Sequence, residues 1–273
     1  MPELPEVETI RRGLSDSIRG KKIADAKIFR PNLRIKFPEG FCDYLKNRTI
    51  KNIKRRSKYL LIENDGDKTL LCHLGMSGKV LVNDNIPDLQ KHDHVLFQFE
   101  DNSSLIYNDA RRFGLMTLVD NDEIDSHPLL CHLGPEPLSN GFSGEVLYQA
   151  LQKKSSPIKN VIMDSRVVVG VGNIYACESL FRSKISPLRK ANKIKRCEAD
   201  TLAANIIDVL KEAIESGGST LKDYVKSTGD MGYFQHKFDV YGREGDLCHN
   251  CASEIKRVKQ QGRSSFYCLS CQS

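Results

Sequence analysis

The chain has 273 residues, of which 40% are hydrophobic and 28% charged, a composition typical of a soluble globular protein with room for two compact domains and a small appendage. No run of about 18 apolar residues occurs, and the amino terminus is acidic, so the sequence argues against a membrane-spanning helix and a signal peptide and predicts a cytoplasmic protein without membrane partners. The net charge of +6 is compatible with an acidic partner such as a nucleic acid.

The first feature along the chain is the segment Met1-Pro2-Glu3-Leu4-Pro5-Glu6-Val7-Glu8-Thr9. Removal of Met1 before a small residue would leave Pro2 with a free secondary amine. An α-amino group titrates near about pH 8, so part of it is unprotonated at neutral pH and able to attack a sugar C1′. Glu3 lies one residue away and could act as general acid and base. The alternative is that Pro2 only begins a helix and Glu3 complements the helix dipole.

The same segment resembles the amino terminus of the formamidopyrimidine-DNA glycosylase family. In that family the mature terminal proline is the nucleophile and the next glutamate is the acid and base. The resemblance therefore assigns these roles to Pro2 and Glu3.

The first half of the chain is predicted to hold one helix and then a set of strands. Apolar residues at helical spacing precede Gly20 and predict a helix that holds the amino terminus in place: Val7, Ile10, Leu14 and Ile18. Short β-rich runs between Gly, Asn and Asp turns follow, and about eight such strands indicate a β-sandwich or barrel. The expected strands are Ile23–Phe29, Ile50–Arg55, Tyr59–Glu63, Thr69–Leu74, Lys79–Val82, His94–Phe99, Ser104–Tyr107 and Leu115–Val119.

A basic turn is expected between two of these strands. The string Arg55-Arg56-Ser57-Lys58-Tyr59-Leu60 belongs to a stretch without acidic residues between Thr49 and Ile62. It resembles the family's basic β-turn, whose lysine contacts the phosphate of the damaged nucleotide and helps proton transfer. The resemblance implies this role for Lys58. Otherwise Lys58 is a surface lysine on a hairpin.

Two further motifs suit an enzyme that removes a base from duplex DNA. They are His73-Leu74-Gly75-Met76-Ser77-Gly78 and Asp109-Ala110-Arg111-Arg112-Phe113-Gly114. Such an enzyme extrudes its target base and fills the vacated space with an apolar wedge and a donor for the orphaned partner base. In the family a Met, an Arg and a Phe of these motifs fill the vacated space and pair with the orphaned base. The resemblance implies this role for Met76, Arg111 and Phe113. Met76 and Phe113 could instead be core residues.

A His/Asp cluster, Lys91-His92-Asp93-His94, lies between these two motifs. By resemblance His92 matches a DNA-contacting histidine of the family. The cluster also allows a metal site, which we consider the less favoured interpretation.

The second half of the chain is predicted to be helical. After the loop at Leu133–Pro137, the main helices are expected at Glu145–Lys154, Asn173–Arg182 and Glu198–Ser216. Between Leu151 and Arg196 there are eleven Lys or Arg residues and two acidic ones. This concentration of positive charge is typical of a protein that binds a phosphate backbone, although a solvated basic face would look the same.

A glycine-rich turn, Gly170-Val171-Gly172-Asn173-Ile174-Tyr175, opens the second of these helices. Glycines allow close approach of a phosphate and the helix start offers N–H donors, although an ordinary helix–helix turn would fit as well. The longer string from Met163 to Phe181 is similar to the family's helix-two-turn-helix, which implies that Asn173 clamps the DNA backbone. Lys159 matches a family lysine near the damaged base, and Lys154 a phosphate contact. The chain has Asn160 where the family usually has proline.

The carboxyl end carries a zinc signature, Cys248-x2-Cys251 and Cys268-x2-Cys271, with sixteen residues between the pairs. A segment of about thirty residues is too small for a hydrophobic core of its own and needs a metal, so we predict one structural Zn²⁺ over a redox or iron–sulfur site. The string from Gln261 to Cys268 resembles the zinc finger of the family. In that finger an arginine binds phosphates and assists elimination, and the resemblance implies this role for Arg263. The alternative is that the finger only stabilises the fold and does not contact DNA.

The other five cysteines lack a disulfide pattern and indicate a reducing compartment.

Together these motifs predict an α+β protein. Its domains would be an N-terminal β-sandwich (1–133), a helical helix-two-turn-helix domain (134–240) and a zinc finger with a β-hairpin (241–273). The Gly- and polar-rich composition predicts a mobile loop at Ser227–Val240. The resemblance further implies a loop within Ser219–Tyr233 whose backbone amides could recognise the damaged base.

The resemblance covers nearly the whole chain and implies a monomeric, bifunctional DNA glycosylase and AP lyase of base excision repair. Its substrate would be double-stranded DNA that contains 8-oxoguanine, formamidopyrimidines or abasic sites, cleaved by β,δ-elimination through a Schiff base. The alternatives are an endonuclease VIII-like enzyme for oxidised pyrimidines and a non-catalytic lesion-binding protein. Endonuclease VIII usually has glycine at the position of Leu4 and lacks the Arg-Arg-Phe-Gly wedge.

Overall fold

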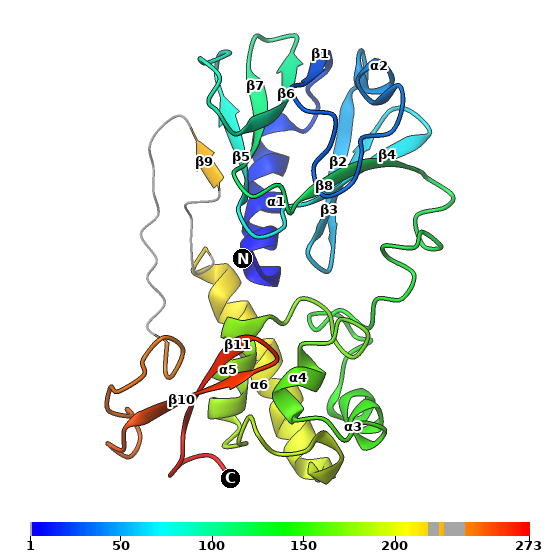
Figure 1. Ribbon diagram of the computed structural model, residues 1–273. Helices are drawn as coiled ribbons and strands as arrows, with labels where there is room; N and C mark the ends of the chain where they lie inside the picture. The colour runs from blue at the N-terminus through cyan, green and yellow to red at the C-terminus, as the bar shows by residue number, and fades with distance from the viewer. Residues whose placement is uncertain (1, 218–223, 227–237) are drawn as a thin grey trace. The chain divides into compact units, whose positions relative to one another are not determined.

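The computed structural model describes residues 2–217, 224–226 and 238–273, and the chain divides into two compact units (Figure 1). Unit 1 comprises Met1–Cys131 and Gly217–Phe234, and unit 2 comprises His132–Ser216 and Gln235–Ser273. Among the described residues, no helix combines the length and the apolar character that a membrane span requires. The division into 1–133, 134–240 and 241–273 stays a prediction.

Unit 1 contains the expected amino-terminal helix and the eight expected strands. Helix α2 (Phe41–Leu45) and strand β9 (Tyr224–Lys226) were not predicted, since each is too short to show a period. The other elements are α1 (Leu4–Ile18), β1 (Ile23–Ile28), β2 (Ile50–Arg56), β3 (Tyr59–Asn64), β4 (Lys68–His73), β5 (Gly78–Asn83), β6 (Asp93–Phe99), β7 (Ser104–Asp109) and β8 (Leu115–Asp120).

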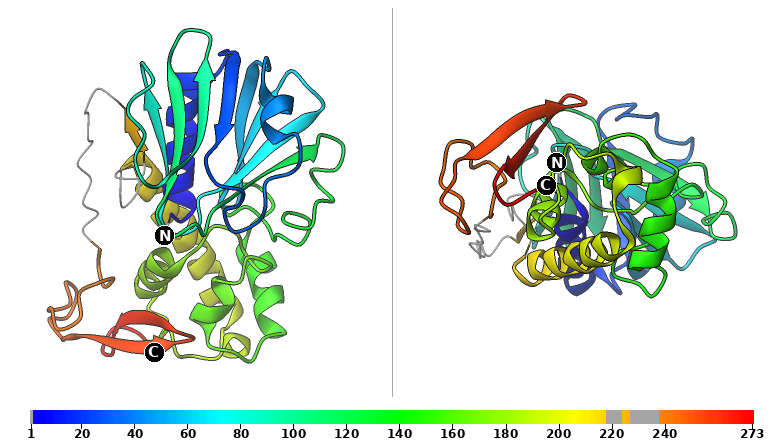
Figure 2. Two further views of the ribbon diagram at one scale, coloured as in Figure 1. Left: turned by 45° about the horizontal axis from the view of Figure 1, so that its top comes forward. Right: turned by 90° about the horizontal axis from the view of Figure 1, so that it is seen from below.

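These strands form two sheets, with the orders β1-β6-β7-β5-β9 and β2-β3-β4-β8 (Figure 2). Neighbouring strands are antiparallel, except that β9 runs parallel to β5 with Tyr224 opposite Val80. Alternate side chains of both sheets enter one buried cluster, and α1 adds its apolar stripe to the same cluster. The predicted α+β class with a β-sandwich is therefore confirmed, and α1 is held in place by the sandwich core.

Unit 2 is built around three helices that lie close to the predicted positions: α3 (Gly144–Gln152), α5 (Asn173–Arg182) and α6 (Arg196–Glu215). Helix α6 packs against both α3 and α5, and its buried face carries Leu202, Ile206 and Leu210. A short helix α4 (Ile158–Ile162) and a 3-10 turn η1 (Ala191–Lys193) complete this part. The sequence did not indicate α4, because five residues are too few for a helical period.

The carboxyl end of unit 2 is a hairpin of β10 (Ile255–Gln260) and β11 (Arg263–Cys268). Its two-residue turn, Gln261-Gly262, has φ angles of 45° and 78°, which suit the twist of a tight hairpin. The loops expected at Ser219–Tyr233 and Ser227–Val240 lie outside the described residues, apart from β9 and residues 238–240.

Candidate active site and nucleic-acid interface

The amino terminus is fixed by hydrogen bonds at the start of α1. Glu3 precedes the first helical residue, and its backbone N–H donates to the Glu6 carboxylate at 2.8 Å. Its carbonyl accepts from the N–H of Val7 at 3.1 Å. Pro2 is buried, and only 2% of Glu3 is exposed. The residues predicted as nucleophile and acid/base are therefore both removed from water, which strengthens electrostatic interactions at this position.

Lys58 lies on the tight turn between β2 and β3 and is partly exposed. The preceding residue, Ser57, is buried and has a φ of 56°. Its carbonyl accepts a hydrogen bond from Nη1 of Arg55 at 2.9 Å, and Nε of Arg55 donates to Glu8 at 3.2 Å. Glu8 belongs to α1, so the turn that carries Lys58 is tied to the helix that carries the amino terminus. Arg55 and Glu8 were not predicted to have this role.

His73, at the end of β4, is another residue whose role the sequence did not indicate. Burial and the nearby positive charges of Lys58 and Arg34 lower the pKa of His73 to about 4. Its Nδ1 accepts a hydrogen bond from the N–H of Gly75 at 2.9 Å, which requires an unprotonated nitrogen. The neutral ring thus holds the loop that carries Met76.

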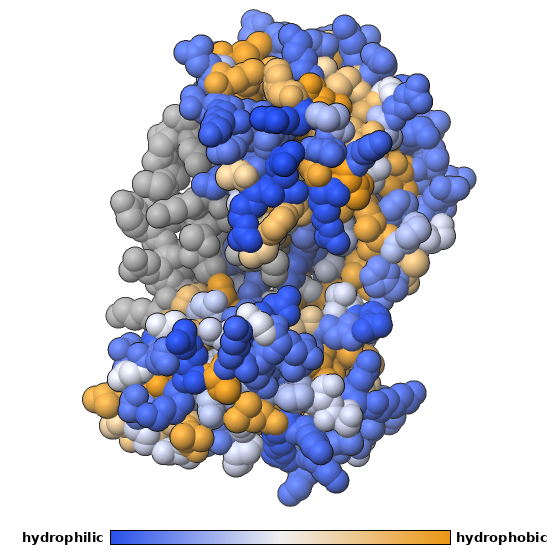
Figure 3. All heavy atoms as spheres, in the orientation of Figure 1, coloured by the Kyte–Doolittle hydropathy of each residue, from blue (hydrophilic) through white to orange (hydrophobic). Residues whose placement is uncertain are grey.

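The three predicted wedge residues are all exposed in unit 1. Met76 is 43% exposed and Phe113 44%, so neither is a core residue of this unit. The Arg111 guanidinium lies 4.6 Å from the centre of the Phe113 ring. The face of unit 1 in Figure 3 is mainly hydrophilic with small hydrophobic groups. Exposed apolar side chains beside an arginine suit insertion into stacked bases.

His92 is partly exposed just before β6, and its carbonyl accepts from the N–H of Asp109 at 3.0 Å. Its neighbours serve the fold: Asp93 accepts from Asn108 at 2.8 Å, and Nε2 of His94 lies 2.8 Å from the Asp109 carbonyl. Within the described ranges, the four carboxyl-terminal cysteines are the one group that could hold a metal, so the structure does not support the alternative metal site at this cluster.

In unit 2, Asn173 begins α5 and lies beside Lys159. Nζ of Lys159 donates to Oδ1 of Asn173 at 2.5 Å, and Nδ2 of Asn173 donates to the Ser264 carbonyl at 2.9 Å. Lys159 also reaches that carbonyl at 3.3 Å, and its side chain is 0% exposed. The two predicted residues therefore meet, and they anchor the hairpin next to Arg263.

Arg263 is exposed and borders an open pocket of about 370 Å³ in unit 2. Among its lining side chains, Lys154, Arg166 and Arg263 are basic and Asp164 is acidic. Hydrogen bonds from Arg166 are the largest cause that lowers the pKa of Asp164, and the charge of Lys154 adds to them. A pocket with this excess of cations suits a phosphate group. The full lining is Lys154, Ser156, Asn160, Val161, Met163, Asp164, Arg166, Gln261 and Arg263.

The thiols of Cys248, Cys251, Cys268 and Cys271 converge, with all four Sγ atoms within 4.8 Å of one another. Sγ of Cys248 lies 3.9 Å from that of Cys271, and Sγ of Cys251 lies 3.4 Å from that of Cys268. Four sulfurs at about 2.3 Å from one tetrahedral ion would be about 3.8 Å apart, so the set fits a metal of that kind.

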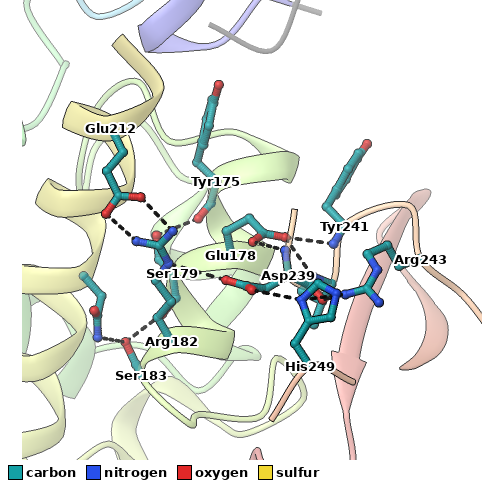
Figure 4. A network of polar contacts seen from close by, with 12 residues as sticks. Tyr175, Glu178, Ser179, Arg182, Ser183, Glu212, Asp239, Tyr241, Arg243 and His249 are labelled. Atoms are coloured by element: carbon teal, nitrogen blue, oxygen red, sulfur yellow. Dashed lines mark hydrogen bonds and ion pairs between the residues drawn. The ribbon is translucent and has the colours of Figure 1, made fainter. Parts of the chain in front are cut away.

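A polar network connects α5 with the segment before the hairpin (Figure 4). The buried carboxylate of Glu178 accepts from the backbone N–H groups of Asp239, Val240 and Tyr241 at 2.8 to 3.1 Å. Burial raises the pKa of Glu178, although these three donors oppose the shift. The sequence offered one signal, an acidic residue between apolar positions of α5, but not its partners.

The comparisons with known proteins agree over both units. The family models "Formamidopyrimidine-DNA glycosylase N-terminal domain" and "Formamidopyrimidine-DNA glycosylase H2TH domain" match residues 1–116 and 133–225. Formamidopyrimidine-DNA glycosylases of Roseobacter denitrificans and Dinoroseobacter shibae are 50% and 48% identical, with complete coverage of both chains in each case. The Lactococcus lactis Fpg in complex with abasic-site DNA is 35% identical, covers 99% of each chain and has a TM-score of 0.91. A MutM structure with DNA containing carbocyclic 8-oxo-G is equally similar.

Proposed function

The chain belongs to the formamidopyrimidine-DNA glycosylase family, and on this premise we propose that it excises oxidised purines from duplex DNA and cleaves the resulting abasic site. The substrates are double-stranded DNA with 8-oxoguanine, formamidopyrimidines or abasic sites, as base excision repair requires. The observation that carries the proposal is the fixed amino terminus, where Pro2 and Glu3 lie buried at the head of α1.

The proposed chemistry begins at the Pro2 nitrogen once Met1 has been removed. Its lone pair attacks C1′ of the damaged nucleotide, the bond from C1′ to the base breaks, and the base leaves with a proton. Glu3 supplies and removes protons near this centre. The C1′–O4′ bond then opens as O4′ takes up a proton, which leaves an iminium ion between Pro2 and C1′. This ion acidifies the C2′ proton, so the 3′ phosphate and then the 5′ phosphate are eliminated. Lys58 and Arg263 contact the phosphates that leave or flank the site.

The wedge and the backbone contacts prepare the DNA for this reaction. Met76 and Phe113 enter the stack as the damaged nucleotide turns out, and Arg111 donates to the orphaned partner base. His92, Lys154 and Asn173 complete the DNA-binding set, and the buried Lys159 contributes to it by holding Asn173 in place. The exposure of the wedge residues and the basic pocket beside Arg263 support this assignment.

The four cysteines would hold one Zn²⁺, because all-thiolate sets at this spacing are typical of structural zinc. Zinc keeps the hairpin folded and supplies no step of the reaction. We further propose a monomer in the cytoplasm, where the DNA substrate is present and the five other cysteines stay reduced.

Borohydride trapping on a duplex with one 8-oxoguanine tests the proposal, after mass spectrometry has confirmed that Met1 is removed. We expect a covalent adduct that maps to Pro2, and loss of base release in both Pro2→Gly and Glu3→Gln. An adduct on a lysine would exclude the proposed nucleophile. Tight binding without turnover would indicate a lesion-binding protein, and a strong preference for thymine glycol an endonuclease VIII-like enzyme.

A further inference from the structure

Asp109, the last residue of β7, has a carboxylate that is 0% exposed and accepts four hydrogen bonds. Oδ1 accepts from Oγ of Ser77 at 2.6 Å and from the N–H of Arg111 at 3.2 Å. Oδ2 accepts from the N–H of Gly114 at 2.9 Å and from the hydroxyl of Tyr107 at 3.2 Å. Burying a carboxylate destabilises the fold unless such donors surround it. The four donors are therefore held at hydrogen-bonding distance from Asp109.

Three of the four donors belong to the two loops that present the wedge, and the fourth, Tyr107, lies on β7. Ser77 follows Met76 in the first loop, while Arg111 is itself a wedge residue in the second. Gly114 follows Phe113 at the end of the second loop. Burial is the largest cause that raises the pKa of Tyr107, and the nearby Asp109 carboxylate adds to it, so the Tyr107 hydroxyl stays protonated and can donate.

The backbones of the two loops also touch. Gly75 has a φ of +64°, and a β-carbon added there would lie 2.3 Å from the carbonyl carbon of Phe113. A β-carbon on Gly114 would meet the Tyr107 hydroxyl. The two loop backbones therefore approach each other closely, and a group that bonds to both loops restrains their common conformation.

We propose that Asp109 is a positioning residue that locks both loops, so that Met76, Arg111 and Phe113 enter the DNA as one preassembled wedge. The proposal rests on the proposed glycosylase function, and it predicts a defect in base extrusion, not in the chemistry at Pro2. A preorganised wedge avoids the entropic cost of ordering two loops at the moment of insertion.

The test uses the full chain and two duplexes, one with 8-oxoguanine and one with an abasic site at the same position. Single-turnover rates are measured on both, together with the fluorescence of 2-aminopurine next to the site, which rises when stacking is lost. Asp109→Asn keeps the size of the side chain but replaces one acceptor with an NH2 group that faces other donors. The matched control is Asp101→Asn, because Asp101 also accepts from a backbone N–H and a hydroxyl, at the other end of the β6–β7 hairpin.

We expect Asp109→Asn to slow base release from 8-oxoguanine DNA at least about tenfold and to reduce the fluorescence rise, while abasic-site cleavage changes less than about twofold. Asp101→Asn should match the unaltered protein on both duplexes. Equal losses on the two duplexes, or no loss on either, would overturn the proposal.

Ser77→Ala provides a second variant, since it removes one of the four donors and is expected to have a smaller effect in the same direction, about threefold. It decides the question if Asp109→Asn does not fold: an unchanged ratio of the two rates in Ser77→Ala would overturn the proposal. Failure of the unaltered protein on both duplexes would instead refute the proposed function.

Discussion

Nε of Arg55 donates a hydrogen bond to Oε2 of Glu8 at 3.2 Å, and this contact joins strand β2 to helix α1. Both side chains are largely buried, with 10% and 13% exposed. Because Arg55 also bonds to the carbonyl of Ser57, the residue before Lys58, it sets the distance between Lys58 and the amino terminus.

Replacing Arg55 with alanine is expected to lower kcat on 8-oxoguanine DNA about tenfold with little change in KM, because Lys58 loses its fixed position in the reacting complex. Steady-state kinetics on one duplex measure both parameters. Arg12→Ala is the matched control, since exposed Arg12 also bonds to Glu8 but does not reach the turn. A raised KM with unchanged kcat would show that Arg55 contributes to DNA affinity alone.

The lowered pKa of His73 is expected to make the free energy of unfolding depend on pH. Its pKa is about 4 in the folded protein, against an ordinary value near 6.5, so between these values the unfolded chain binds a proton that the folded chain does not. Stability therefore falls on acidification, and His73 alone costs about 2 kcal/mol of unfolding free energy between about pH 7 and pH 5. Urea unfolding at both values should show a smaller loss in His73→Asn, which keeps an acceptor near Gly75. An equal loss in both proteins would contradict the expectation.

Removal of the metal is expected to unfold the hairpin and weaken DNA binding at least about tenfold, since the buried cluster of the finger is small and depends on its cysteines. Cys248→Ser should release zinc and have the same effect, measured by metal content and by titration of labelled duplex. Cys197→Ser, at an exposed thiol away from the cluster, should bind like the unaltered protein. Undiminished affinity in metal-free Cys248→Ser would refute a structural role.

Substitutions of Lys154 and Lys159 are expected to have different effects on the salt dependence of DNA binding. Lys154 lines the basic pocket and is partly exposed, so Lys154→Ala should reduce the slope of log K against log salt by about 0.9. Lys159 is fully buried against Asn173 and Ser264, so Lys159→Met should weaken binding without a change of slope. A reduced slope in Lys159→Met would show that this lysine contacts phosphate directly.

The sequence by itself determined the features that depend on local pattern. Short β-rich runs between turn residues placed the eight strands of unit 1 within one or two residues, and helical spacing placed α1, α3, α5 and α6, because strand and helix preferences depend on the local sequence. The two CxxC pairs were equally clear, since four thiolates at this spacing satisfy one tetrahedral ion. The motifs also indicated the family, which the full-length relatives confirm.

Only the tertiary structure decided how the motifs support one another. Lys159 meets Ser264 across 105 positions of the chain, and Glu8 meets Arg55 across 47, distances at which no local period operates. Asp109 looked like the first residue of a motif, yet burial made it the acceptor that joins both wedge loops. The lowered pKa of His73 likewise arises from burial and from two positive charges, Lys58 and Arg34, that are distant in the chain but near in space. Desolvation and charge pairing depend on which side chains packing brings together, so these properties appear only in the folded chain.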